Sequence, residues 1–167
     1  TNHKVGRAEQ LGTKAAEEGV NTAVLREAVV IQMTWPGAPT VYYGDEAGLC
    51  GFTDPDNRRT YPWEKEDLEM LDFHKRMICI HKAYPLLAKG SLEFLWNDHQ
   101  GLSYGRFSDS EQIIVILNNQ DQERDIRVTA WKTGVSRKEA TAFQRLMLSS
   151  RDGYTEKAEK YIADAGI

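Results

Sequence analysis

Cysteine is scarce in this sequence, which contains only Cys50 and Cys79. Neither belongs to a CxxC pair or lies at a metal-type spacing from a histidine, so the sequence indicates neither a zinc site nor a disulfide framework. Free thiols favour a reducing compartment, and we expect a cytoplasmic protein. No charged segment followed by an apolar one opens the chain. A secreted protein whose signal peptide has been removed would look the same.

A surplus of positive charge is also absent, because 21 Lys and Arg residues face 25 Asp and Glu residues and the formal net charge is −4. We therefore expect no nucleic-acid partner. Long apolar runs are lacking too: no stretch approaches the roughly 20 residues needed to cross a bilayer, which excludes a membrane protein. The remaining composition, with 41% hydrophobic, 28% charged and 10% aromatic residues, is typical of a globular protein.

Proline is missing from the second half of the chain. All five prolines lie within the first 85 residues of 167, and the hydrophobic pattern changes near Gly90. A chain of this length is large enough for one large domain or two small ones. We therefore predict two domains, over residues 1–89 and 90–167.

The first predicted domain has an α/β pattern. Asn21 is a good N-cap for the apolar run 22–33, which predicts a largely buried helix. After a Pro-Gly turn, the β-branched and aromatic run 40–43 predicts a short buried strand. Apolar residues at helical spacing over 67–84 predict an amphipathic helix, which Pro85 ends.

The second predicted domain has a period of two. Apolar and polar residues alternate in four segments separated by turn residues, which predicts an antiparallel β meander. Residues 141–149 can add a further strand. Residues 155–163 are rich in Glu, Lys and Ala, so propensity alone predicts a helix there. The four alternating segments are 92–96, 102–107, 112–118 and 123–131.

The loop 54–59 carries the densest charge cluster, Asp-Pro-Asp-Asn-Arg-Arg, beside Phe52, Tyr61 and Trp63. It follows the predicted strand, and loops at the carboxyl ends of strands commonly hold polar ligands in α/β folds. Carboxylates, guanidinium groups and aromatic rings together suit a sugar. The structural alternative is an Asp-Pro turn whose arginines pair with its own aspartates.

Other chemistry-bearing residues are less informative. Asp45 and Glu46 could serve as acid and base in glycoside cleavage, but neighbours on an extended chain point to opposite sides, which favours a structural role. His74 and His81 lie too far apart on one helix for a single metal ion, and we expect both at the surface or half-buried. Three tryptophans are expected in the core. These are Trp35, Trp96 and Trp131.

Three segments resemble one enzyme family. IQMTWPGAPTVYYGDEAG (31–48) resembles the seventh helix and eighth strand of the α-amylase superfamily, glycoside hydrolase family thirteen. DPDNRR (54–59) followed by YPW (61–63) resembles its neopullulanase, cyclomaltodextrinase and α-glucosidase-like branch. HKAYPLL (81–87) resembles the end of its eighth barrel helix. The resemblance implies an α/β plus all-β fold: the last helix, strand and helix of a (β/α)8 barrel, then an antiparallel β-sandwich that lacks its last strand here. It also implies a strand over 155–163, so the choice between helix and strand there stays open.

The resemblance also implies a mechanism, retaining hydrolysis of α-glucosidic bonds in starch-derived glucans. The family's three catalytic carboxylates are expected upstream of this sequence, so none is assigned here. Asn2-His3-Lys4 is similar to the family's Asn-His-Asp motif, with Lys4 at the aspartate position. Either the carboxylate has been lost, or the likeness is accidental and the motif lies upstream. Asp54 and Arg58 match positions expected to bind sugar hydroxyls, while Asp56 and Arg59 are expected to brace the loop.

These implications give expectations for the chain itself. No cofactor is expected, and calcium binding in the parent enzyme stays open. We expect the chain alone to show no turnover, which leaves open whether it counts as an enzyme, and to form oligomers or swapped strands because residues 40–43 have no strand to pair with. Two alternatives to a piece of a hydrolase remain: a non-catalytic carbohydrate-binding module, and a purely structural piece that closes the barrel.

Overall fold

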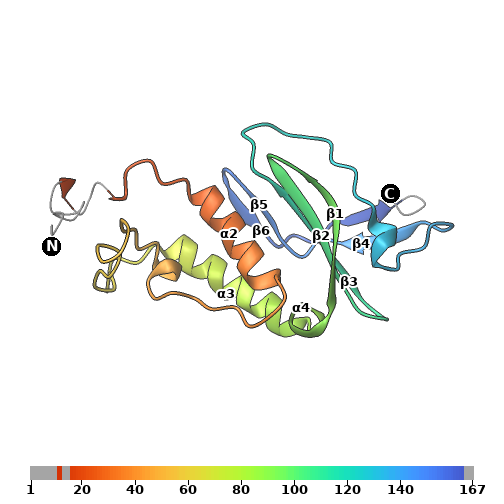
Figure 1. The fold of residues 1–167 in the computed structure, drawn as a ribbon, viewed down its shortest axis with the longest axis horizontal. Coiled ribbons are helices and arrows are strands. Elements are labelled where there is room, and N and C mark those ends of the chain that lie inside the picture. The colour runs from red at the N-terminus through yellow and green to blue at the C-terminus, as the bar shows by residue number, and fades with distance from the viewer. Residues whose placement is uncertain (1–10, 13–15, 164–167) are drawn as a thin grey trace, which may run out of the picture.

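A computed structural model describes residues 11–12 and 16–163 of the chain (Figure 1). Two helices lie side by side, and a three-stranded sheet packs against one of them. A short hairpin near the end of the chain returns to the helices, so segments that are far apart in sequence lie next to each other. Within the described ranges, no helix is both long and apolar enough to cross a membrane.

Helix α2 spans Thr22–Thr34, close to its predicted range. The Asn21 side chain accepts hydrogen bonds from the backbone N–H groups of Ala23 at 3.0 Å and Val24 at 3.4 Å, as expected for an N-cap. The helix is only partly buried, which corrects the expected extent of burial. Its apolar residues at positions 24 and 25 are exposed, because neighbouring elements cover one side of the helix.

Helix α3 spans Leu68–Ala83 and confirms the predicted amphipathic helix. The Asp67 side chain caps it by accepting a hydrogen bond from Met70 N at 3.0 Å. Its buried face packs against α2 in one hydrophobic cluster, and a short helix, α4 (Leu86–Lys89), follows. The buried members of the cluster are Val29, Met33, Phe73 and Met77.

Residues 40–43 form no strand, contrary to the sequence-based prediction. Val41, Tyr42 and Tyr43 are 36%, 47% and 44% exposed rather than buried. A strand needs a neighbour to pair its backbone groups, and no described segment pairs with this one. A 3-10 helix, η2 (Asp45–Ala47), follows directly. The expected eighth barrel strand is thus absent from the described chain.

The largest sheet has the order β1-β2-β3, with antiparallel neighbours, and confirms three predicted strands: Ser91–Asp98, Gly101–Phe107 and Gln112–Asn118. One face packs on α2 through Val30 and Ile31. Tyr104, Val115 and Leu117 form the buried part of that contact. The sheet and the helix therefore share one core.

Residues 123–131 do not form the fourth strand that their alternation predicted. The segment ends in a 3-10 helix, η3 (Ala130–Thr133), which lies against the sheet. Thr129 Oγ1 donates a hydrogen bond to Leu95 O at 2.8 Å. A Cβ added at Gly105 would lie 2.2 Å from Thr133 Cγ2, so the contact is close. The end of this segment therefore packs against β1 and β2 instead of extending the sheet.

The end of the chain contains two separate strand pairs. Residues 141–149 contribute β4 (Thr141–Gln144) and β5 (Leu148–Ser150). Strand β5 pairs with β6 (Gly153–Thr155), and β4 pairs with β7 (Lys160–Ala163). Residues 155–163 are therefore partly strand and not helix, because backbone pairing overrides the helix propensity of Glu, Lys and Ala.

Arg106 links the helices to the sheet from a fully buried position. Its guanidinium group has no carboxylate partner among its hydrogen bonds. It donates instead to five backbone carbonyls, which lie at the end of α2, at the start of α4, directly after α4 and at the start of β1. Burial lowers the pKa of the guanidinium. The acceptors are Thr34 (2.6 Å), Leu87 (2.5 Å), Leu86 (3.1 Å), Gly90 (2.8 Å) and Ser91 (3.2 Å). The domain boundary near Gly90 stays a prediction. Chain segments from before and after Gly90 both contact the Arg106 side chain.

Four side chains lie elsewhere than expected. Trp96 and Trp131 are half-buried and do not belong to the core. Trp35 is not in the core but exposed, with its ring 5.3 Å from the Tyr104 ring and 6.1 Å from the Phe94 ring. His74 is buried, because its face of α3 packs inward. His74 Nδ1 lies 3.0 Å from Met70 O, so Nδ1 carries the hydrogen.

Candidate functional site

The loop 50–63 presents the two residues that the sequence analysis selected for sugar binding. Backbone hydrogen bonds from Asp56 N to Thr53 O and from Arg58 N to Pro55 O, both 3.0 Å, form tight turns. Gly51 lets the loop fold back on itself, because a Cβ there would lie 2.6 Å from Asn57 Cα. These turns bring the side chains of Asp54 and Arg58 together.

Asp54 and Arg58 form a two-point ion pair, which we call the Asp54–Arg58 fork. Arg58 Nε donates to Asp54 Oδ1 at 2.7 Å, and Nη2 donates to Oδ2 at 3.0 Å. The carboxylate raises the pKa of the guanidinium. The side chains are 59% and 65% exposed, so solvent or a ligand can reach the fork. The internal pairing is the one that the structural alternative predicted, and its role in sugar binding stays a prediction.

Arg59 points to a different set of partners. Its Nη1 donates to Cys50 O at 2.5 Å and to Glu17 Oε1 at 3.3 Å. These contacts tie the loop to the segment that precedes α2, as expected of a residue that braces the loop. The two neighbouring arginines therefore differ: Arg59 is used for internal bonds, while Arg58 stands at the surface.

Two pairs of aromatic rings lie within residues 42–63. Tyr42 and Tyr43 form a pair with ring centroids 4.9 Å apart, and the Tyr43 hydroxyl donates to Arg59 O at 2.8 Å. Tyr61 and Trp63 form another pair at 4.6 Å. Trp63 is 76% exposed. The sequence analysis missed the two tyrosines as surface residues, because their apolar run resembles a buried strand.

Asp45 and Glu46 begin η2, between Gly44 and Gly48, which both have positive φ values. Glu46 Oε2 accepts a hydrogen bond from Gly44 N at 3.0 Å, so this carboxylate closes its own turn. Burial raises the pKa of Asp45, which the charge of His74 lowers in part. This arrangement supports the structural role expected for the two acids.

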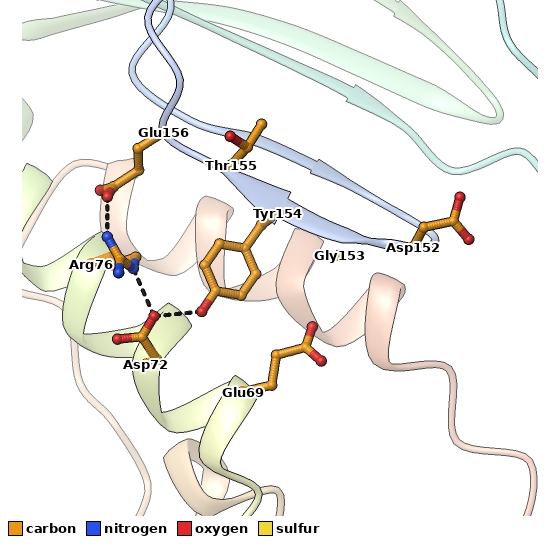
Figure 2. A pocket seen from close by; sticks show the side chains of 8 residues that line it. All are labelled: Glu69, Asp72, Arg76, Asp152, Gly153, Tyr154, Thr155 and Glu156. Carbon is orange, nitrogen blue, oxygen red and sulfur yellow. Dashed lines mark hydrogen bonds and ion pairs between the residues drawn. The ribbon is translucent and has the colours of Figure 1, made fainter.

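A shallow pocket of about 500 Å³ lies between α3 and the β5–β6 hairpin (Figure 2). The Tyr154 hydroxyl donates to Asp72 Oδ2 at 2.6 Å, and Arg76 Nε donates to the same oxygen at 2.7 Å. Arg76 also pairs with Glu156. Because these groups bind one another, the network fastens the hairpin to the helix. Sequence reasoning missed it, since nothing local connects positions 72 and 154.

A cofactor site is not evident in the part of the chain that the structure describes. There, no three His, Cys, Asp or Glu side chains come together in a way that could hold a metal ion. The similarity of Asn2-His3-Lys4 to the catalytic motif, and with it the question of Lys4, falls outside the described residues.

Comparison with known sequences finds relatives of one kind, although no family model matches the chain. An amylopullulanase from Thermoanaerobacter thermohydrosulfuricus is 33% identical over 71% of this chain. Neopullulanase 2 from Thermoactinomyces vulgaris is 33% identical over 70% of it. A cyclomaltodextrinase from Thermoanaerobacter pseudethanolicus is 36% identical over 62% of it. The aligned parts cover only 9%, 20% and 18% of those relatives, so the chain spans a small share of their length.

Solved structures agree with the sequence matches. The debranching enzyme of Nostoc punctiforme superposes on 77% of this chain and 27% of its own, with a TM-score of 0.64 and 28% identity. An α-amylase from Geobacillus thermoleovorans, solved in complex with acarbose, covers 97% of this chain and 35% of its own. Its TM-score is 0.65 and its identity 24%, so it shows the fold alone.

The sequence matches and the similar folds thus relate this chain to part of the amylase-type glycoside hydrolases. The chain is homologous to the amylopullulanases, neopullulanases, cyclomaltodextrinases and maltogenic amylases of glycoside hydrolase family thirteen, and the resemblance carried by its motifs is confirmed.

Proposed function

We propose that this chain is the C-terminal portion of a glycoside hydrolase that cleaves α-glucosidic bonds of starch-derived glucans with retention. The observation that carries the proposal is the exposed Asp54–Arg58 fork, which lies in the loop that resembles this family. A guanidinium and a carboxylate together offer donors and acceptors to sugar hydroxyls, and hydrogen bonds to charged groups are strong.

The parent enzyme supplies the bond-breaking groups in this proposal. Retaining hydrolysis uses two carboxyl groups about 5–5.5 Å apart, one as nucleophile and one as acid and base. Both are expected in the part of the barrel that precedes this chain. Residues 1–89 then supply the last helix, strand and helix of the barrel, and residues 90–167 form a β-sandwich. Residues 40–43 become a strand once neighbouring barrel strands are present to pair with them.

The test of this proposal uses the longest open reading frame that contains the chain. We expect its product to release reducing sugar from soluble starch, pullulan or cyclodextrins, and we expect the new reducing end to be the α-anomer in a proton NMR spectrum recorded early in the reaction. The 167-residue chain, incubated alone under the same conditions, is expected to release none. Release of the β-anomer would contradict retention, and cleavage by the chain alone would return Asp45, Glu46 and Asp54 to the list of candidate catalysts.

Assembly of the isolated chain is part of the proposal. The exposed run 40–43 and the exposed apolar side of α2 invite association, so we propose that the chain forms oligomers or exchanges strands between copies. Light scattering on the purified chain tests this, and a monodisperse monomer would count against it.

The two cysteines are free in the structure, which supports a reducing, cytoplasmic compartment.

A carbohydrate-binding module is the second candidate function. The observation that favours it is that the Asp54–Arg58 fork is formed and exposed in this chain by itself. This second candidate function predicts that the chain binds maltooligosaccharides without cleaving them. In the purely structural alternative, the chain binds no sugar and contacts only the rest of its enzyme.

A further inference from the structure

The β5–β6 hairpin contacts both long helices near their first turns. Arg26 of α2 donates to Ser149 Oγ at 3.1 Å and to Ser150 O at 2.7 Å, although the first two residues are 123 positions apart. Tyr154 donates to Asp72 of α3 at 2.6 Å (Figure 2). Strand β5 is therefore bonded to α2, and strand β6 is bonded to α3.

Arg26 is the central residue of this contact. Its side chain is only 3% exposed, and its Nη1 donates to Glu69 Oε1 in the first turn of α3 at 3.0 Å. One guanidinium group thus bonds to α3 and to the hairpin from its position on α2. Such a group fixes the spacing of the three segments, because movement of any of them breaks a hydrogen bond to a charged donor.

The starts of the same two helices also hold the loop 50–63. Directly before α3, the backbone N–H of Asp67 donates to Ala47 O at 3.0 Å, which bonds the helix start to the chain that enters the loop. Near the end of the loop, Arg59 Nη1 donates to Glu17 Oε1 at 3.3 Å, and Glu17 precedes α2. The loop region therefore spans the space between the two helix starts that Arg26 and the hairpin hold together.

We propose that the β5–β6 hairpin, with Arg26 as the positioning residue, sets the spacing of α2 and α3 and thereby the position of the loop 50–63. The hairpin has strands of only three residues each. Hairpins of that size are not stable alone, so this one keeps its conformation through its bonds to the helices. The inference rests on the proposed function only for its consequence, which is that the position of the loop affects substrate binding.

The two cysteines allow loop position to be measured in the whole 167-residue chain. Cys50 lies half-buried at the start of the loop, where burial raises the pKa of its thiol, whereas Cys79 is exposed on α3. Peptide mass spectrometry gives the rate at which iodoacetamide modifies each thiol, and Cys79 serves as the internal reference. Displacement of the loop raises the ratio of the Cys50 rate to the Cys79 rate, because access and thiolate fraction both increase. Arg59→Met, which removes direct bonds of the loop, is the positive control.

We expect Arg26→Met to raise the Cys50-to-Cys79 ratio by about threefold or more. Ser149→Ala removes only the acceptor of Arg26 Nε and should raise the ratio by less. Gly105→Ala is the matched control: it destabilises the chain at the contact between η3 and the sheet, and the ratio is expected to stay within about twofold. Circular dichroism shows whether each variant is folded.

The control separates a positioning role from a general loss of stability. An unchanged ratio in folded Arg26→Met overturns the inference. An equal rise in Gly105→Ala overturns it as well, because the loop would then respond to any destabilisation. If Arg26→Met does not fold, Ser149→Ala decides the question, and an unchanged ratio in that variant overturns the inference.

Kinetics of the product of the longer reading frame test the consequence for substrate. We expect Arg26→Met to raise KM for soluble starch by about threefold or more and to leave kcat within about twofold, because Arg26 is buried and acts through the position of the loop. A raised thiol ratio with an unchanged KM supports the positioning and contradicts the role of the loop in sugar binding. An inactive wild-type product contradicts the proposed function, while the thiol ratio still decides the inference.

Discussion

The helix–sheet body, made of helices α2 to α4 and strands β1 to β3, and the loop region 40–63 differ in how their polar side chains are bonded. In the body, the largest buried polar side chains bond to other groups of the fold: Arg106 donates to five carbonyls, and Tyr104 and Thr34 bond to each other at 2.5 Å. In the loop region, Arg58 and Asp54 pair at the surface, and tyrosine rings stay exposed. Buried hydrogen bonds are therefore concentrated in the body, while exposed charged and aromatic side chains lie in the loop region.

Replacement of Arg106 should have the largest effect on the body. Arg106→Met leaves several buried carbonyls without a donor, each at a cost of about 1–3 kcal/mol, and we expect a loss of at least about 3 kcal/mol in the free energy of unfolding measured with urea. Arg124→Met is the control. Arg124 has a single acidic partner, Asp98, near the surface, so its loss should cost less than about 1 kcal/mol. Equal stability of Arg106→Met and the wild type would remove the proposed link between helices and sheet.

A substitution at the contact between η3 and the sheet is expected to cause the second-largest loss of stability. Gly105→Ala places a Cβ 2.2 Å from Thr133 Cγ2, and overpacking of this kind costs about 1–3 kcal/mol. Thr133→Ser removes that methyl group and keeps the hydroxyl, which donates to Ala130 O at 2.8 Å. Thermal melts should therefore show that Thr133→Ser restores most of the stability lost in Gly105→Ala. A double variant as unstable as Gly105→Ala would mean that another contact excludes a side chain at position 105.

The network between α3 and the hairpin predicts a smaller, pH-dependent effect. Hydrogen bonds from Tyr154 and Arg76 lower the pKa of Asp72 below that of an unfolded chain. Ionised Asp72 therefore stabilises the fold at pH values above its unfolded pKa of about 3.9, and the contribution is lost as the pH falls through the lower folded pKa.

We expect Asp72→Asn to be less stable than the wild type at pH 7 and the difference to shrink as the pH falls below about 3.9. Urea titrations at several pH values measure this, with the exposed turn substitution Asp109→Asn as control. A difference that stays constant with pH would show that the carboxylate charge is not what fastens the hairpin.

The fork should have the smallest effect on stability. Because both partners are exposed, Arg58→Ala should change the free energy of unfolding by less than about 0.5 kcal/mol. In the parent enzyme, the same substitution should raise KM or lower kcat/KM by an amount equivalent to about 1.5–3 kcal/mol. Steady-state kinetics of the parent enzyme and urea denaturation of the chain together test whether Arg58 contributes to activity and not to stability. A large stability loss with unchanged kinetics would reverse the roles of the two regions.

The sequence correctly predicted the elements that depend on residues close together in the chain. Asn21 and Asp67 cap two helices near their predicted starts, and the alternation after Gly90 matched β1, β2 and β3, which are joined by short turns. The charge cluster drew attention to the loop 54–59, and the family resemblance then selected Asp54 and Arg58 within it. Each of these features depends on residues only a few positions apart.

The segments where the prediction was wrong, or was left open as for 155–163, depend on distant partners. Residues 40–43 have the composition of a buried strand, but a strand forms only where another strand pairs with it. Residues 155–163 have helix propensity, yet pairing of Lys160–Ala163 with Thr141–Gln144 decided their conformation. Residues 123–131 alternate like a strand but cover the sheet through η3. Such outcomes follow from the arrangement of the whole chain, which single-segment patterns do not contain.

The sequence by itself determined the enzyme family, the two helices, the main antiparallel sheet and the charged loop, because motifs, caps and periodicity act over short distances. Only the tertiary structure decided that Arg106 joins helices to sheet, that Tyr154 meets Asp72, and that the Tyr43 hydroxyl bonds to the backbone of Arg59. Each of these contacts joins residues many positions apart, and their free energy arises from burial and hydrogen bonding that exist only after the chain has folded.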